Sequence, residues 1–144
     1  MLIRVFDILF SSLALIILAP LFIIVCIILR CSGEGEILYK QERIGQDNKK
    51  FKLIKFATML KNSPNIGSGS LTVRNDPRVL PFGKALRKTK INELPQLINI
   101  LTGDMSLVGP RPLHEIQFMY YSNEVQRTVS SVRPGLTGAA SIIF

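Results

Sequence analysis

The longest apolar stretch of the chain runs from Ile8 to Leu29 and contains no charged residue. As a helix it is long enough to cross a hydrocarbon layer of roughly 30 Å. It is too long for the apolar region of a signal peptide, and no small-residue cleavage site follows it, so we expect it to be retained. Pro20 lies near its middle and removes a backbone donor, which predicts a kink or a break there.

Two paths through a membrane fit this stretch. One is a kinked helix that spans the bilayer, and the other is a re-entrant helix-break-helix that enters one leaflet and returns. Ser11 and Ser12 could satisfy backbone carbonyls freed near a break. In either case all but one of the 18 Lys and Arg residues follow the stretch. Basic segments beside a membrane stay in the cytoplasm, so we expect the remainder of the chain there.

The pattern after the apolar stretch is mixed. Apolar and basic residues alternate between residues 37 and 56 around the turn Gly45-Gln46-Asp47-Asn48, which predicts a β-hairpin with a basic face. A polar loop near residues 61–70 and a turn-rich segment near residues 75–83 follow. A helix is expected to begin at Lys84. A second helical stretch is expected over residues 115–126, partly buried or in contact with the membrane interface.

Helical spacing of apolar residues also begins at Ile91 and continues to Leu101. Asn92 and Glu93 fall outside this apolar stripe, so we expect them to face a cleft or solvent. Pro95 favours either a helix whose first turn begins near Asn92 or a local kink. The first arrangement would leave Asn92 near a helix N-terminus, where free amides favour an anion.

Composition narrows the choice of partner. The chain has 144 residues, which suggests one domain, with 47% hydrophobic residues and a net charge of +8. A basic and apolar protein indicates an anionic partner at an apolar boundary. Trp is absent and there are 3 Tyr, so base-stacking platforms are scarce and nucleic acid is disfavoured. Cys26 and Cys31 are expected to be reduced, small hydrophobic residues, and the single His gives no zinc spacing.

Four basic residues lie just before Glu93: Lys84, Arg87, Lys88 and Lys90. At helical spacing the first three share one face, which predicts a basic helix face. Arg111 stands between two prolines and Arg133 precedes a Pro-Gly turn, so both have the fixed backbone that suits bidentate phosphate recognition. The alternative for each basic residue is a solvated surface charge. Glu93 could bind Mg²⁺, act as a base or attack phosphorus. Its alternative is a surface salt bridge.

Four segments carry a resemblance to a known family. They read "RIGQDNKKFKLIKFATM", "NDPRVLPFGKALRKTK", "NELPQLINILTGDMSLVGPRP" and "VRPGLTG". In this order they resemble the bacterial monotopic phosphoglycosyl transferases, also called the bacterial sugar transferase family. The resemblance runs from the apolar N-terminus to about Gly138.

The resemblance implies an α/β fold: a re-entrant membrane helix broken at Pro20 (residues 1–30) and a small cytoplasmic body with amphipathic interfacial helices (residues 31–144). It implies transfer of a sugar-1-phosphate from a UDP-sugar to polyprenyl phosphate, with release of UMP, at the cytoplasmic face of the bacterial inner membrane. Mg²⁺ is the implied cofactor, held by Glu93. The implied phosphate or substrate ligands are Arg87, Arg111 and Arg133.

The sequence departs from the family pattern at the catalytic pair, where Asn92-Glu93 stands in place of the usual Asp-Glu. Glu93 could be the nucleophile or base, Asn92 could be an inactivating change, or the acceptor phosphate could attack directly while Asn92 donates a hydrogen bond. A silent membrane adaptor that binds polyprenyl phosphate or a partner enzyme is the alternative function. Ala57 and Ala139 also depart from the pattern. The given sequence stops at Phe144, earlier than many members of the family, so a missing C-terminal tail is one expectation.

Overall fold

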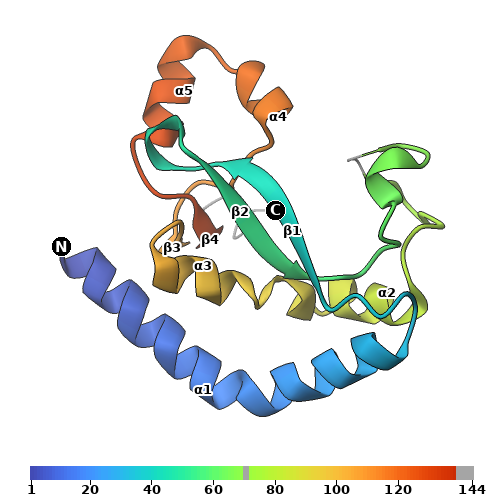
Figure 1. Cartoon of the computed structure of the whole chain (residues 1–144). Coiled ribbons are helices and arrows are strands. Elements are labelled where there is room, and N and C mark those ends of the chain that lie inside the picture. Colours follow the sequence, from blue (N-terminus) through green and yellow to red (C-terminus); the bar gives the residue numbers. More distant parts are fainter. Residues whose placement is uncertain (70–71, 139–144) are drawn as a thin grey trace. The chain divides into compact units, whose positions relative to one another are not determined.

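The computed structural model describes residues 1–69 and 72–138 of the chain, and Figure 1 shows its elements. Ala139, one of the departures from the family pattern, lies outside the described residues. The longer elements are α1 (Leu2–Cys31), β1 (Leu38–Ile44), β2 (Lys50–Phe56), α2 (Pro81–Lys88), α3 (Gln96–Thr102) and α5 (Asn123–Ser130). The shorter ones are η1 (Gln46–Asn48), η2 (Ser63–Asn65), η3 (Ile91–Glu93), β3 (Ser106–Val108), α4 (Glu115–Met119) and β4 (Gly135–Thr137).

The backbone contacts divide the chain into two compact units. The first unit comprises Met1–Ile17, Lys40–Ile54 and Gln96–Phe144, and the second comprises Leu18–Tyr39 and Lys55–Pro95. The chain passes from one unit to the other within α1 and within both strands of the hairpin. Each unit therefore contains part of the apolar helix and part of the polar chain.

Helix α1 confirms the predicted long apolar helix. It is a single ribbon in Figure 1, and the helical assignment continues through Pro20, so the proline does not end the helix. Only 11% of its most apolar 18-residue window is buried inside the protein. Large side chains such as Ile16, Ile17 and Ile23 are more than half exposed. By length and composition α1 can therefore lie in a bilayer, and its re-entrant path stays a prediction.

The core of the second unit forms where the last turns of α1 meet the end of the hairpin. Val25 and Leu29 from α1 pack with Phe56 from β2 and Leu86 from α2, and all four are buried. The ring of Phe22 lies 5.3 Å from that of Phe56, centroid to centroid. Burial of these apolar side chains is the main stabilising contribution in this unit.

The predicted hairpin is confirmed. Strands β1 and β2 pair in a two-stranded sheet. Between them, η1 contains Asp47 and Asn48 at φ of 56° and 59°, a left-handed conformation in which these two residue types are several-fold enriched. The side chain of Asn99 from α3 supports β2, because its Oδ1 accepts from the Ile54 amide at 3.0 Å and its Nδ2 donates to the Lys52 carbonyl at 2.9 Å.

A second sheet in the first unit was not predicted from the sequence. β3 and β4 form a parallel pair in which Ser106 is opposite Gly135 and Val108 is opposite Thr137. Each strand has three residues, which is too short to show an alternating pattern of apolar and polar positions.

Three helix predictions need correction. α2 begins at Pro81, because a proline is well tolerated at the first helical position, and not at Lys84. The helical spacing from Ile91 is divided, since η3 ends at Glu93 and α3 begins at Gln96, directly after Pro95. The single helix expected over residues 115–126 is divided into α4 and α5, with residues 120–122 between them; Phe118 is buried, whereas Ile116 and Met119 are each 69% exposed.

We predict that Gly83→Ala strongly destabilises the second unit. A Cβ atom at Gly83 would lie 2.2 Å from the backbone oxygen of Thr58, so backbone rather than a flexible side chain would have to move. The free energy of unfolding should fall by about 1–3 kcal/mol or more. Urea unfolding in detergent, followed by circular dichroism, measures it. Lys84→Ala, an exposed neighbour in α2, is the control, and equal effects of the two changes would contradict the prediction.

Candidate active site

The start of α2 is fixed to the segment that follows β2. The Leu80 amide donates to the Thr58 carbonyl at 2.9 Å, and the Leu60 amide donates to the Arg78 carbonyl at 2.9 Å. Gly83 brings the first turn of α2 against the Thr58 backbone, where a side chain would not fit. These contacts determine where α2 carries its basic residues.

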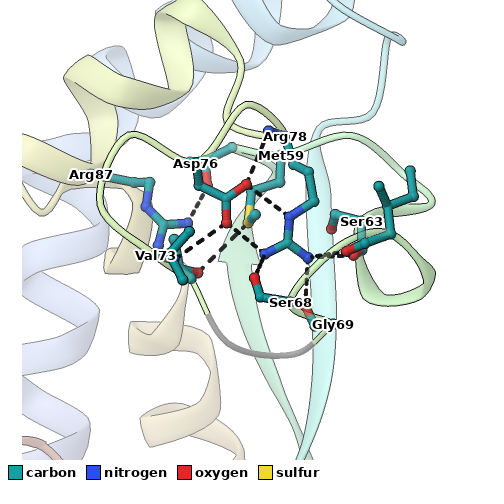
Figure 2. Close-up of polar contacts among 11 residues, drawn as sticks. Met59, Ser63, Ser68, Gly69, Val73, Asp76, Arg78 and Arg87 are labelled. Carbon is teal, nitrogen blue, oxygen red and sulfur yellow. Dashed lines mark hydrogen bonds and ion pairs between the residues drawn. The ribbon is translucent and has the colours of Figure 1, made fainter.

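Arg78 organises the loop that precedes α2, as Figure 2 shows. Its side chain is 3% exposed, and its Nε and Nη2 atoms contact both oxygens of Asp76 at 2.8 and 2.5 Å. Its guanidinium also donates to the carbonyls of Ser63 (2.6 Å), Ile66 (2.8 Å) and Gly69 (2.6 Å). One buried cation thus gathers carbonyls from across the loop, and the bidentate pair with Asp76 offsets its loss of water.

This ion pair shifts the acidity of both partners. Hydrogen bonds from the Arg78 side chain hold the pKa of the Asp76 carboxyl far below its usual range, against the opposing effect of desolvation. The same hydrogen bond raises the pKa of Arg78. Both groups therefore stay charged across the neutral range, and the loop keeps its anchor.

Arg87, a predicted phosphate ligand, lies on α2 and is half-buried. Its Nη1 donates to the Thr58 hydroxyl at 3.3 Å, which restrains the guanidinium. Among the described residues, its other donors have no protein acceptor. Lys84 and Lys88 on the same helix are exposed. The predicted basic face of this helix is therefore present, and Arg87 is its most restrained member.

Asn92 and Glu93 form η3, directly after a sharp change of chain direction. α2 ends at Lys88, and Lys90 takes a left-handed φ of 62°. Asn92 is 8% exposed, so it does not face open solvent, and none of the described residues donates a hydrogen bond to its Oδ1. The apolar spacing did not reveal this burial. Glu93 is half-buried, and the described residues offer its carboxylate no hydrogen bond or ion pair.

Arg111 and Arg133 lie in the first unit, on two turns that the β3–β4 pair joins. The Gly135 amide donates to the Pro110 carbonyl at 2.8 Å, and the Gly109 amide donates to the Thr137 carbonyl at 2.9 Å. A Cβ atom at Gly135 would lie 2.1 Å from the Gly109 amide nitrogen, so the close approach requires glycine. The Gly-Pro-Arg-Pro and Arg-Pro-Gly motifs are therefore neighbours in space.

The structure thus brings the predicted site residues together in two groups. Arg87, Asn92 and Glu93 belong to the second unit, and Arg111 and Arg133 belong to the first. Arg111 is exposed and lines a shallow hollow with Gly45, Phe118 and Pro134. Within the described ranges, no three His, Cys, Asp or Glu residues gather as a metal site.

Several polar residues that support these groups were not found from the sequence. Thr58, Arg78 and Asn99 each hold backbone segments in place, and Arg4 and Asp7 hold polar contacts at the start of α1. The turn-rich segment around Arg78 was recognised, but nothing in its residue types showed that the arginine would turn inward. Isolated polar residues of this kind carry no spacing signal in one sequence.

Comparison with known proteins identifies the family. The model of the bacterial sugar transferase family matches residues 1–144. The chain is 40% identical to the exopolysaccharide production protein ExoY of Sinorhizobium fredii over 94% of this chain and 66% of that protein. It is 39% identical to the exopolysaccharide production protein PSS of Rhizobium leguminosarum bv. phaseoli, over 96% of this chain and 72% of that protein.

A third relative carries a more specific name. The UDP-glucose:undecaprenyl-phosphate glucose-1-phosphate transferase of Escherichia coli is 37% identical over 96% of this chain, which covers 30% of that longer protein. The chain belongs to the bacterial sugar transferase family. It spans about two thirds of the length of the ExoY protein.

We predict that Asp76→Asn weakens the second unit in a pH-dependent way. Because the pKa of Asp76 is lowered in the folded state, its carboxylate stabilises the fold above the unfolded-state value of about 4, and this contribution is lost as the pH falls below that value. The urea midpoint of the variant should be lower than that of the wild type at pH 7, and the difference should shrink below about pH 4. Asp47→Asn, an exposed carboxyl, is the control, and a difference that is constant with pH would contradict the prediction.

Proposed function

We propose that this protein transfers a sugar-1-phosphate from a UDP-sugar to polyprenyl phosphate at the cytoplasmic face of the bacterial inner membrane. One oxygen of polyprenyl phosphate becomes bonded to the sugar-bearing phosphorus, and the bond from that phosphorus to UMP breaks. The products are a polyprenyl-diphosphate sugar and UMP, and the step begins assembly of a surface glycan.

The observation that carries this proposal is the match of the whole chain to one family, together with the site groups. The family includes a relative named for transfer of glucose-1-phosphate to undecaprenyl phosphate. The basic face of α2, the carboxylate of Glu93 and an apolar helix suit an anionic donor and a lipid phosphate at a membrane surface. A soluble phosphate-binding protein would not need the exposed apolar side chains of α1.

Glu93 is the residue we assign to carboxylate chemistry. Its half-buried carboxylate has no protein partner among the described residues, and no other acid lies within η3. The groups present fit Mg²⁺, because this ion is held by one or two protein oxygens plus substrate phosphates. The carboxylate of Glu93 and the unpartnered Oδ1 of Asn92 are such oxygens. When bound, the ion would neutralise charge on the diphosphate.

Asn92 is assigned to positioning and hydrogen bonding. A neutral amide is a poor nucleophile, but its buried Oδ1 lacks a partner, and a buried acceptor without one is costly. A substrate hydroxyl, a metal ion or its water would satisfy that acceptor. Arg87 in the same unit, and Arg111 and Arg133 in the other, are proposed to bind the donor and acceptor phosphates.

The membrane path that we propose is re-entrant. In the first unit, polar side chains of the N-terminal turn of α1 bond to residues near α3 and β3. In the second unit, the last turns of α1 pack on β2 and α2. Each end of α1 thus has its own contacts with a polar part of the chain, the N-terminal turn in the first unit and the last turns in the second. A spanning path would carry one of these polar parts across the bilayer.

We predict that Glu93→Gln abolishes turnover while the fold is retained, because the change keeps shape and hydrogen bonding but removes the charge. Asn92→Asp should keep or raise activity and permit a trapped phosphosugar adduct, measured as a mass increase of the intact protein. The assay is UMP release from UDP-sugars with polyprenyl phosphate and Mg²⁺. Glu124→Gln, an exposed acid on α5, is the matched control.

Normal turnover by Glu93→Gln would show that our assignment of Glu93 is wrong. If the wild type and Asn92→Asp are both inert with every UDP-sugar tried, but the protein still binds polyprenyl phosphate, the enzyme proposal fails. The silent adaptor would then be the better account.

We predict that Arg87→Ala and Arg111→Ala each lower kcat or raise the KM for the UDP-sugar by a factor on the order of 10 to 1,000. The reason is the loss of a charge-assisted contact to phosphate, which gains strength in the transition state. Steady-state kinetics measure both parameters. Lys84→Ala, an exposed cation on α2, should change them less than Arg87→Ala, and unchanged kinetics in both arginine variants would remove the phosphate role.

A further inference from the structure

A buried acid lies in the first turns of the apolar helix. Asp7 is 2% exposed, and its Oδ1 accepts hydrogen bonds from the Ser106 hydroxyl and from the Leu107 amide, each at 3.0 Å. Its Oδ2 is buried and has no hydrogen-bond partner. All three residues belong to the first unit, so α1 is tied through Asp7 to the beginning of β3.

One turn earlier, Arg4 makes a matching contact. Its Nη2 donates to the Leu101 carbonyl at 2.5 Å, and its Nη1 donates to the Ile100 carbonyl. These carbonyls lie in the last turn of α3, where the helix dipole favours a cation. Gly103 follows this turn at a φ of 94°, a backbone conformation that favours glycine.

Arg4 and Asp7 therefore form hydrogen bonds with the two ends of one segment, residues 100–107. The acid takes donors from the chain entering β3, and the base takes acceptors from the chain leaving α3. Both charged side chains would be expensive in lipid without partners. Each contact makes burial of the N-terminal turn against the body more favourable than its transfer through a bilayer.

We propose that Arg4 and Asp7 form a polar latch that holds the N-terminal turn of α1 on the same membrane face as the body. The latch rests on the membrane location given under the proposed function. Pro20 does not by itself explain why the N-terminal turn would stay on that face, because α1 remains helical through the proline. The latch supplies this explanation. The latch ties the N-terminal turn of α1 to the first unit, and separately Val25 and Leu29 pack in the core of the second unit.

The other explanation for retention on the cytoplasmic face is charge alone. Arg4 and the N-terminal amine would keep the end in the cytoplasm by the positive-inside rule, and Asp7 would have no part in it. The two explanations predict opposite changes in cytoplasmic retention of the N-terminal end for one variant. Asp7→Ala makes the end more positive and should strengthen retention if charge decides, whereas it removes the latch's acceptor.

The experiment uses the full chain with Cys26→Ala and Cys31→Ser, and with Leu2→Cys as the reporter thiol. A membrane-impermeant maleimide labels intact cells with a permeabilised outer membrane, and then inverted inner-membrane vesicles. The latch predicts that the reporter thiol of this parent chain is labelled only in inverted vesicles. When Asp7→Ala is added, the fraction labelled from the periplasm should rise about tenfold, the effect expected from losing hydrogen bonds to a carboxylate.

Matched variants separate hydrogen bonding from charge. Asp7→Asn keeps an oxygen acceptor for Ser106 and Leu107, so its labelling should resemble that of the parent chain. Arg4→Lys keeps the charge but loses the two-pronged contact with α3, so its periplasmic labelling should rise. If Asp7→Ala does not accumulate as a monodisperse protein in detergent, Arg4→Lys carries the test.

The outcomes distinguish the latch from the function. Labelling of the parent chain from the cytoplasmic side, with no change in Asp7→Ala and Arg4→Lys, overturns the latch and leaves the proposed transfer reaction intact. Labelling of the parent chain from the periplasm overturns both the latch and the re-entrant path. UMP release by the same vesicles reports separately on the transfer reaction.

Discussion

The exposed apolar side chains of α1 need an apolar environment, and the rest of the structure depends on this constraint. The most apolar window of α1 is 11% buried, so lipid must cover what the protein does not. The second unit takes the last turns of the helix into its core through Phe56 and Leu86, while the first unit takes its N-terminal turn through polar contacts. In the membrane location that we propose, these contacts of α1 would hold each unit at the membrane surface, where a lipid-linked phosphate would be found.

The elements that were predicted from the sequence are those with a strong local signal. The apolar helix has an uninterrupted run, and the hairpin has alternation with a turn of Asp47 and Asn48, whose left-handed backbone suits their residue types. β3 and β4 were missed because each has three residues and depends on a partner far along the chain. Their pairing requires close approach of Gly109 and Gly135, which appeared in the sequence only as turn residues.

The candidate site divides in the same way. The charged residues were found because lysines and arginines cluster before Glu93 and stand beside prolines at Arg111 and Arg133. The residues that support them were not found from the sequence. A threonine such as Thr58 or a buried arginine such as Arg78 belongs to no periodic pattern and acts through contacts that only the folded chain creates. The burial of Asn92 and the left-handed backbone of Lys90 were not predicted either, because neither residue type indicates them in one sequence.

The order of the elements along the chain has a consequence for biosynthesis. α1 is made first and is apolar enough to enter the membrane while the remainder is still being translated. β4 follows every other described element, and α4 and α5 separate it in sequence from its partner β3. The turn that carries Arg111 therefore waits for Gly135 to be synthesised before it gains its hydrogen-bonded neighbour. α1 is therefore available for insertion into a bilayer before the turns of Arg111 and Arg133 are joined.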